Sequence, residues 1–384
     1  MARLTRVQQQ ARTRAAVLVA AREEFIAHGY AAAKVDRIAE RAELTRGAVY
    51  SNFPGKRALY LAVLIELVEL VDGVAPAQAA QPSAQPPARP PARPPASLAD
   101  ALGAFARTWL ERLPLVDDTA AGGRLQLRSL VGVFDDERGR AALAQLAHVE
   151  ALLLGLALES GVPGEAPGRR VRLAELVLTL LGGAGFLAET APGFGDPFDR
   201  ARACEHLARL DLADRWEPSY LPYVAPAETC REPWSPPAGL TDLLTGEPVD
   251  LGADGLVAVL GAGRLAAAEE AVRSARPGDR VTVVVATDDP AETGSLVRLR
   301  VRDLAACLRA VFPPESWQRL RLVVDGGAAV ASAAGLAAEG DEEEAAVRIR
   351  GGAIVARGHG RGAAHAVSTA PITPTVGPSR RTEA

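Results

Sequence analysis

The 384-residue sequence predicts a multidomain protein in which two all-α parts are followed by an α/β domain. Three observations support this fold class. Apolar residues recur at steps of three and four through most of the first 217 residues, as in amphipathic helices. Two proline-rich segments, at 75–96 and 218–238, interrupt the pattern and are expected to be extended linkers. After residue 238, short β-branched runs alternate with helical stretches, which is typical of a sheet covered by helices.

These observations divide the chain into six expected segments. They are a helical head at 1–74, a proline-rich linker at 75–96, a helical bundle at 97–217, a second linker at 218–238, an α/β domain at 239–370 and a disordered tail at 371–384. We expect the α/β domain to have its own core and to share few contacts with the helical parts, because prolines join them.

The head carries a charge opposite to that of the remaining chain. Its first 64 residues hold eleven Lys or Arg and five Asp or Glu, a net charge of +6, whereas the whole chain has 43 basic and 47 acidic residues. Such an asymmetry suggests a polyanionic partner for the head. A solvated basic face without a partner has the same composition, so charge alone does not decide between the two interpretations.

Periodicity within the head predicts four helices. Leu18, Ala21 and Phe25 share one face of the first helix, because they are spaced by three and four residues. Glycine tolerates the left-handed conformation that ends helices. The expected elements are a first helix ending at Gly29, a second over Val35–Ala42, a third over Thr45–Phe53 with Thr45 as its N-cap, and a fourth over Lys56–Val71.

The second and third helices are joined by a turn of about four residues, and the third is short and polar on its outer side. This is the helix-turn-helix arrangement, in which the second helix of the motif enters the major groove of DNA. Arg46 and Asn52 can form hydrogen bonds with base edges, and Gly47 allows close approach of the backbone. Tyr50 and Lys56 can bond phosphates. The alternative is a helical bundle that binds nothing.

The run AREEFIAHGYAAAKVDRIAERAELTRGAVYSNFPGKRALYLAVL resembles the N-terminal domain of the TetR family of transcriptional regulators. The resemblance covers about Arg14 to Val71 and includes Tyr50 and Phe53, then Lys56 and Leu59, at intervals of three residues. It departs from the family before the second helix, where Ala33-Lys34 replaces the usual Thr or Ser. In the family, the hydroxyl of that Thr or Ser contacts a DNA phosphate, and Lys34 can supply this contact by its charge. The DNA-contacting residues that the resemblance implies are Lys34, Thr45, Arg46, Gly47, Tyr50, Ser51, Asn52 and Lys56.

The resemblance also implies a function for the whole chain. It predicts a homodimeric, cytoplasmic repressor that binds a palindromic double-stranded DNA operator and is released by a small-molecule effector. The bundle at 97–217 corresponds to the family's effector-binding and dimerisation domain. His148 and His206 are candidates for polar groups of a pocket there, with surface or interface positions as the alternative. No catalytic residue, cofactor or metal site is predicted.

The C-terminal third predicts the order β-α-β-α-β-α-β-β and resembles the thioredoxin-like fold. The segment GAGRLAAAEE, where that fold carries its redox cysteines, contains no cysteine, and Glu344-Ala345-Ala346 stands where a proline is usual. Without a thiolate there is no nucleophile for disulfide exchange. We therefore expect a redox-inactive module, in which Cys307 is a small buried hydrophobe.

A different interpretation gives the α/β domain a nucleotide. Gly261 and Gly263 follow a strand and precede a helix, which is a weak form of the dinucleotide fingerprint, but Ala266 replaces its third glycine. The alternative function is thus a thioredoxin-like or nucleotide-dependent oxidoreductase fused to a DNA-binding head. The three cysteines are widely spaced, and no apolar run of about 18 residues is evident, so we expect a reducing compartment and no membrane span.

Overall fold

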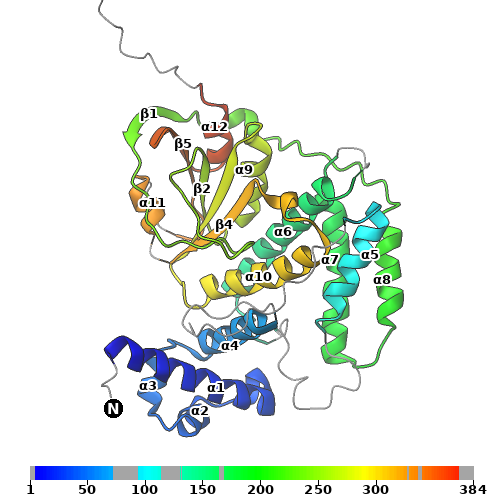
Figure 1. Ribbon diagram of the computed structural model, residues 1–384, viewed down its shortest axis with the longest axis vertical. Helices are drawn as coiled ribbons and strands as arrows, with labels where there is room; N and C mark the ends of the chain where they lie inside the picture. Colours follow the sequence, from blue (N-terminus) through cyan, green and yellow to red (C-terminus); the bar gives the residue numbers. More distant parts are fainter. Residues whose placement is uncertain are drawn as a thin grey trace, which may run out of the picture.

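A computed structural model describes residues 5–71, 94–113, 130, 132–163, 168–326, 328–335 and 340–371. Most of the expected linker at 75–96 and nearly all of the expected tail at 371–384 lie outside these residues. Figure 1 shows a small helical head at one end, a group of longer helices beside a sheet, and helix α10 (Thr293–Val311) running between the sheet and the head. This placement of α10 decides how the parts of the molecule are connected.

The head contains the four expected helices: α1 (Arg6–Ala32), α2 (Val35–Arg41), α3 (Arg46–Tyr50) and α4 (Lys56–Val71). Gly29 interrupts the helical geometry of α1 with φ of +68°, as the sequence predicts. An aromatic cluster holds α1 against α4. The rings of Phe25 and Tyr60 meet edge to face with centroids 4.9 Å apart, and Tyr30 lies 5.0 Å from Tyr60.

The next part of the chain forms α5 (Leu98–Leu110), α6 (Glu137–Ser160), α7 (Val171–Thr190) and α8 (Pro197–Leu207). Ser97 caps α5 by accepting a hydrogen bond from the Asp100 amide at 3.1 Å, which confirms the expected start of that helix. Asp136 caps α6 in the same way through the Gly139 amide at 2.8 Å.

The remaining residues build a six-stranded mixed sheet. Its strands are β1 (Glu228–Pro233), β2 (Gly255–Gly261), β3 (Arg280–Ala286), β4 (Leu320–Asp325), β5 (Glu344–Arg350) and β6 (Ala353–His359). They lie in the order β1-β6-β5-β2-β3-β4. The pairs β2–β3 and β3–β4 are parallel, and the other pairs are antiparallel.

The helices of this part are α9 (Ala268–Ser274), α10, α11 (Ala329–Ala333) and α12 (Ala363–Thr369), with short 3₁₀ turns at η1 (Leu221–Tyr223), η2 (Leu265–Ala267) and η3 (Pro314–Trp317). The predicted order β-α-β-α-β-α-β-β is confirmed, and so is the hairpin at Gly351-Gly352, where both glycines have positive φ. Strand β1 was not predicted and lies within the expected linker at 218–238. Helix α12 was not predicted either.

The expectation of few contacts between the α/β part and the helices is wrong. Helix α10 belongs to the α/β part by sequence, yet it packs against α4, α5 and α6. Twelve of its 19 residues are buried. A helix that packs on the core with a single apolar stripe would bury fewer. One hydrophobic cluster consequently runs from the head through the helices to one face of the sheet, and a smaller cluster covers the other face.

Two helices of the described chain, α6 and α7, are long and apolar enough to cross a membrane by length and composition. For α6, 61% of the apolar window is buried inside the protein, as in the core helix of a soluble protein. For α7 the buried share is 33%, so much of its apolar surface is open. From the sequence no membrane span was expected in this part of the chain.

Candidate nucleic-acid interface

Helix α3 presents most of the predicted DNA-contacting residues together. Thr45 starts the helix, and its hydroxyl accepts a hydrogen bond from the Ala48 amide at 3.2 Å. Val49 is buried with Phe53 and fixes the inner side of the helix on the head. The remaining positions of the set, Arg46, Gly47, Tyr50 and Ser51, are exposed on the outer side. The short turn between α2 and α3 thus leaves a polar helix uncovered.

Two polar side chains that directly follow α3 donate to the backbone of that helix. The Asn52 side-chain amide and the Ser51 hydroxyl both donate to the carbonyl oxygen of Ala48, each at 2.9 Å. Asn52 is also half-buried. One of its two N–H donors is thus engaged within the head, and the other donor and the amide oxygen are those left for an adenine edge. These two hydrogen bonds to the Ala48 carbonyl oxygen were not predicted from the sequence.

Arg46 is the most accessible candidate for base recognition. It forms an ion pair with Asp36 on α2 at 3.2 Å, with 61% of each side chain exposed, and its guanidinium lies 5.4 Å from the centre of the Tyr50 ring. Contact with the Tyr50 hydroxyl, followed by the charge of Asp36, raises the pKa of Arg46. An exposed ion pair is weak, so DNA can displace Asp36 at little cost.

The two lysines differ in their availability. Lys34 is exposed at the N-cap of α2, where a cation can reach a phosphate. Lys56 is half-buried, donates to the carbonyl oxygen of Ala31 at 3.1 Å and lies 4.8 Å from the centre of the Tyr30 ring. Burial lowers the pKa of Lys56. Lys56 therefore joins α4 to the end of α1, and its phosphate contact stays a prediction.

A buried carboxylate, which was not among the predicted site residues, positions α2. Glu24 is fully buried, and it accepts a hydrogen bond from the Lys34 amide at 3.1 Å. Arg37 and Arg41 approach the same carboxylate at 3.5 and 3.6 Å. Glu24 follows Val17 and Ala21 on the apolar stripe of α1, and an acidic residue at such a position is the signal that could have revealed it.

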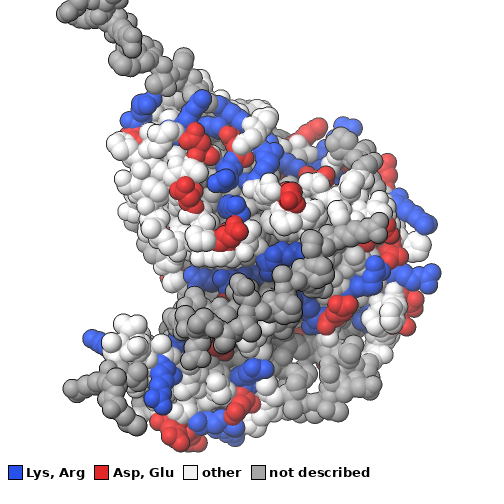
Figure 2. All heavy atoms as spheres, in the orientation of Figure 1, with Lys and Arg blue, Asp and Glu red and all other residues white. Residues whose placement is uncertain are grey.

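Arg14 is a second missed residue. Its guanidinium lies 4.3 Å from the centre of the Phe53 ring and donates to the Asn52 carbonyl oxygen at 3.4 Å. Arg14 thereby connects α1 to the end of the exposed helix. On the face of the head seen in Figure 2, basic and acidic side chains are interspersed, so the head's excess of positive charge is not concentrated on this one face.

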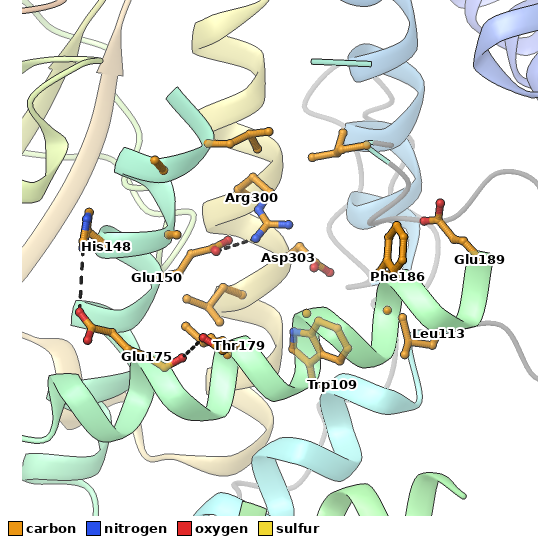
Figure 3. A pocket seen from close by; sticks show the side chains of 18 residues that line it. Trp109, Leu113, His148, Glu150, Glu175, Thr179, Phe186, Glu189, Arg300 and Asp303 are labelled. Carbon is orange, nitrogen blue, oxygen red and sulfur yellow. Dashed lines mark hydrogen bonds and ion pairs between the residues drawn. The ribbon is translucent and has the colours of Figure 1, made fainter. Parts of the chain in front are cut away.

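A cavity of about 690 Å³ lies between α5, α6, α7 and α10. Figure 3 shows Trp109, Leu113 and Phe186 at one end, and the Glu150–Arg300 ion pair, 2.6 Å long, on the wall formed by α6 and α10. His148 lines the cavity beside Glu175, with 3.9 Å between its Nδ1 and the carboxylate, whereas His206 is not part of the lining. A concave, mostly apolar cavity with a few polar groups is typical of a small-molecule site.

The glycines of the weak dinucleotide fingerprint have a structural explanation. The Gly261 and Gly263 amides donate to the carbonyl oxygens of Glu343 and Asp341 at 2.8 and 2.7 Å. A Cβ atom at Gly263 would lie 2.2 Å from a carboxylate oxygen of Glu342. These amides are thus occupied by an acidic turn, which would repel a pyrophosphate. The arrangement does not favour the nucleotide-dependent alternative.

The cysteines are placed as structural residues. Cys307 is fully buried on α10, as predicted, and Cys204 is fully buried on α8. Burial raises the pKa of Cys204 to about 12. Burial also raises the pKa of Cys230, which is half-buried. Raised pKa values keep these two thiols protonated at neutral pH and therefore weakly nucleophilic.

The head of the chain is similar to the DNA-binding domains of known regulators. Residues 17–63 match the family profile described as bacterial regulatory proteins, tetR family. The chain is 46% identical over 65 residues to the HTH-type transcriptional activator FasR of Mycolicibacterium smegmatis, and 45% identical over 64 residues to the HTH-type transcriptional regulator SrpR of Pseudomonas putida. Each match covers only 17% of this chain and 30% of the relative.

Solved structures match a longer part of the chain at lower similarity. NalD, the secondary repressor of the MexAB-OprM multidrug efflux pump in Pseudomonas aeruginosa, is 22% identical, and a TetR regulator from Chloroflexus aurantiacus is 25% identical. The matches cover 52% of this chain and 95% and 94% of those chains, with a TM-score of 0.30 in both cases. TM-scores this low do not show that the remaining helices are arranged as in those proteins.

Proposed function

We propose, from the tetR-family helix-turn-helix domain at residues 17–63, that this protein is a DNA-binding transcriptional regulator. The single observation that carries the proposal is α3, a short helix with a buried inner side and an exposed row of polar residues that follows α2 after a tight turn. Such a helix fits the major groove. In this assignment Arg46 reads a base edge, and Lys34 bonds a phosphate.

A small-molecule effector is the proposed signal, and the cavity between α5, α6, α7 and α10 is its proposed site. Its size and apolar walls support this assignment. Helix α10 borders the cavity through Arg300, and it also packs on α4 of the head. A ligand that displaces α10 would therefore change the position of α4. We propose release of the protein from its operator as the outcome, which makes it a repressor.

A homodimer on a palindromic operator completes the proposal. Large apolar side chains are exposed on α7 and α8, including Phe186 at 53% and Phe198 at 73%. Helix α7 also has a largely open apolar surface. Packing of these two helices against the same helices of a second copy would cover both side chains and set two heads at the spacing of operator half-sites.

For the α/β part we propose a non-enzymatic, thioredoxin-like module in a cytoplasmic protein. The loop and helix that follow β2 carry no cysteine, and the amides of Gly261 and Gly263 are occupied. The oxidoreductase alternative predicts reduction of insulin disulfides or turnover of peroxide by the purified protein, and we expect neither activity.

The test of DNA recognition is selection of binding sites from random double-stranded DNA with the full chain. The site obtained is then measured with two variants. Arg46→Ala is expected to reduce the preference for one base pair by about 1–3 kcal/mol, because a base contact is lost. Lys34→Ala should weaken binding equally on all sequences and lower the salt dependence by about one unit. If the selection yields no enriched sequence, or if Arg46→Ala keeps the full discrimination, the proposal for α3 is refuted.

A further inference from the structure

A second cavity lies between the head and the α/β part. It measures about 660 Å³ and is bordered by α1, α4, residues 239–243, α10 and the end of β4. It is separate from the proposed effector cavity, whose lining comes from α5, α6, α7 and the other side of α10. Leu18, Ile65 and Leu243 give it apolar walls. The regulatory function proposed above assigns this cavity no role.

Helix α10 supplies positive charge to this cavity. The helix contains four arginines and a single acidic residue, Asp303. Figure 2 shows a band of basic side chains over α10, along the boundary between the α/β part and the head. Ser295, Arg298 and Arg302 all border the cavity, since residues spaced by three and four lie on one side of a helix.

The arginines of α10 differ in whether a carboxylate neutralises them. Arg302 forms an ion pair with Glu69 of α4, and Arg300 forms its ion pair with Glu150 on the other side of the helix. In the described part of the chain, Arg298 has neither a hydrogen bond nor an ion pair. It is half-buried, and burial, followed by the charge of Arg302, lowers the pKa of Arg298. A desolvated guanidinium without a counter-charge is costly, so this position favours an anion.

The two carboxylates that border the cavity, Glu66 and Glu69, do not neutralise Arg298. Glu69 is engaged by Arg302. Burial is the main cause that raises the pKa of Glu66, whereas the charges of Arg22 and Arg14 on α1 act in the opposite direction. Counting Arg14, the cavity is bordered by three arginines and two glutamates. The excess positive charge belongs to Arg298.

We propose that this cavity binds a small organic anion, with a carboxylate or phosphomonoester group on a compact apolar body. The anionic group bonds the planar guanidinium of Arg298, which suits two parallel hydrogen bonds, and the Ser295 hydroxyl is a further donor on the same side of α10. The apolar body packs against Leu18, Ile65 and Leu243. Because the walls come from α1 and α4 as well as α10, the bound anion contacts both the head and the α/β part.

The experiment is isothermal titration calorimetry of the full chain with 2-naphthoate and 2-naphthyl phosphate. The neutral 2-naphthamide and the cationic 2-naphthylmethylammonium serve as charge controls, and inorganic phosphate as the control without an apolar body. We expect both naphthyl anions to bind with a Kd of about 1 mM or tighter. The three control compounds should bind at least about tenfold more weakly, because each lacks one of the two proposed contacts.

Three variants localise the site. Arg298→Gln should weaken the naphthyl anions at least about tenfold, whereas Arg350→Gln, at an exposed arginine on β5, should leave the Kd unchanged. Ala11→Trp fills the cavity from α1 without altering Arg298 and should abolish binding. Equal binding to wild type and Ala11→Trp, equal binding of 2-naphthamide and 2-naphthoate, or no binding by wild type would each overturn the proposal.

Discussion

At the scale of single residues, the head depends on a carboxylate that points inward. Glu24 is fully buried, yet Lys34, Arg37 and Arg41 reach it from α2. Its bond to the Lys34 amide satisfies a donor at the start of α2, a helix whose N-cap residue makes no side-chain cap of its own. Glu24 therefore holds the first helix of the motif against α1, and α3 takes its position from α2.

Substitution of Glu24 tests this dependence. Glu24→Gln keeps the size of the side chain but removes its charge, so the hydrogen bond from Arg37 is weakened and the ion pair with Arg41 is lost. We expect a loss of about 1–3 kcal/mol in the stability of the head, measured from amide hydrogen exchange of α2 and α3. Glu23→Gln is the matched control, because Glu23 bonds Arg41 at the surface with 57% of its side chain exposed, and its loss should cost no more than about 0.5 kcal/mol. Equal effects of the two substitutions would show that Glu24 does not position α2.

The residues that were predicted from sequence are those whose role is set by near neighbours in the chain. Thr45 was predicted as an N-cap because the cap and the amide that it bonds are three residues apart. The occupied donors of Asn52 and Lys56 were not predicted. The Lys56 ammonium bonds a carbonyl 25 residues away, which only the folded head brings near.

At the scale of elements, α10 differs most from its expectation. Its second half was predicted only as one of the helices of a separate α/β domain. In the structure Arg302 and Arg300 of α10 bond Glu69 and Glu150, which lie 233 and 150 residues earlier. Each partner is on a helix of another part of the chain. No local pattern reveals such pairs, so the connection between the parts could not be predicted although the helix itself was.

The connection between α10 and α4 leads to a prediction about coupling. The Arg302–Glu69 pair is three-quarters or more buried, and Arg57 bonds Glu292 at 3.1 Å near the start of each helix. A double-mutant cycle with Arg302→Gln and Glu69→Gln is expected to give a coupling energy of about 1 kcal/mol in the unfolding free energy. The exposed Arg41–Glu23 pair should give no more than about 0.5 kcal/mol in the same measurement. Additive effects of Arg302→Gln and Glu69→Gln would mean that this pair does not connect α10 to the head.

At the scale of the whole molecule, one hydrophobic core connects the head, the helices and the α/β part, which the sequence predicts as separate segments. The order of strands and helices in the α/β part follows from local patterns, whereas β1 lies within a segment that was expected to be a linker. The assembly of the parts depends on which helix faces meet, and that is a property of the folded chain. The hydrophobic cluster that runs through α4, α6 and α10 puts the head in direct packing contact with α10, the helix that borders both proposed ligand sites.

The open surface of α7 and α8 is the remaining feature at this scale, and it carries the prediction about assembly. Phe186 and Phe198 are more than half exposed in the single chain, which is unusual for aromatic residues on two neighbouring helices. If two copies pack through this surface, both side chains become buried in the dimer. Phe186→Glu and Phe198→Glu should then each weaken dimerisation by about 2 kcal/mol or more, since a charge replaces an apolar anchor.

Sedimentation equilibrium of the full chain measures this effect. We expect a dimer for wild type and a dissociation constant raised at least about thirtyfold for each variant, with a parallel loss of affinity for a two-half-site operator. Tyr223→Glu is the control, because Tyr223 is 87% exposed on η1 and lies outside the surface of α7 and α8. A single half-site should be bound equally by wild type and both phenylalanine variants, since one head contacts it in each case. A wild-type dimer that persists unchanged in both variants would place the dimer interface elsewhere.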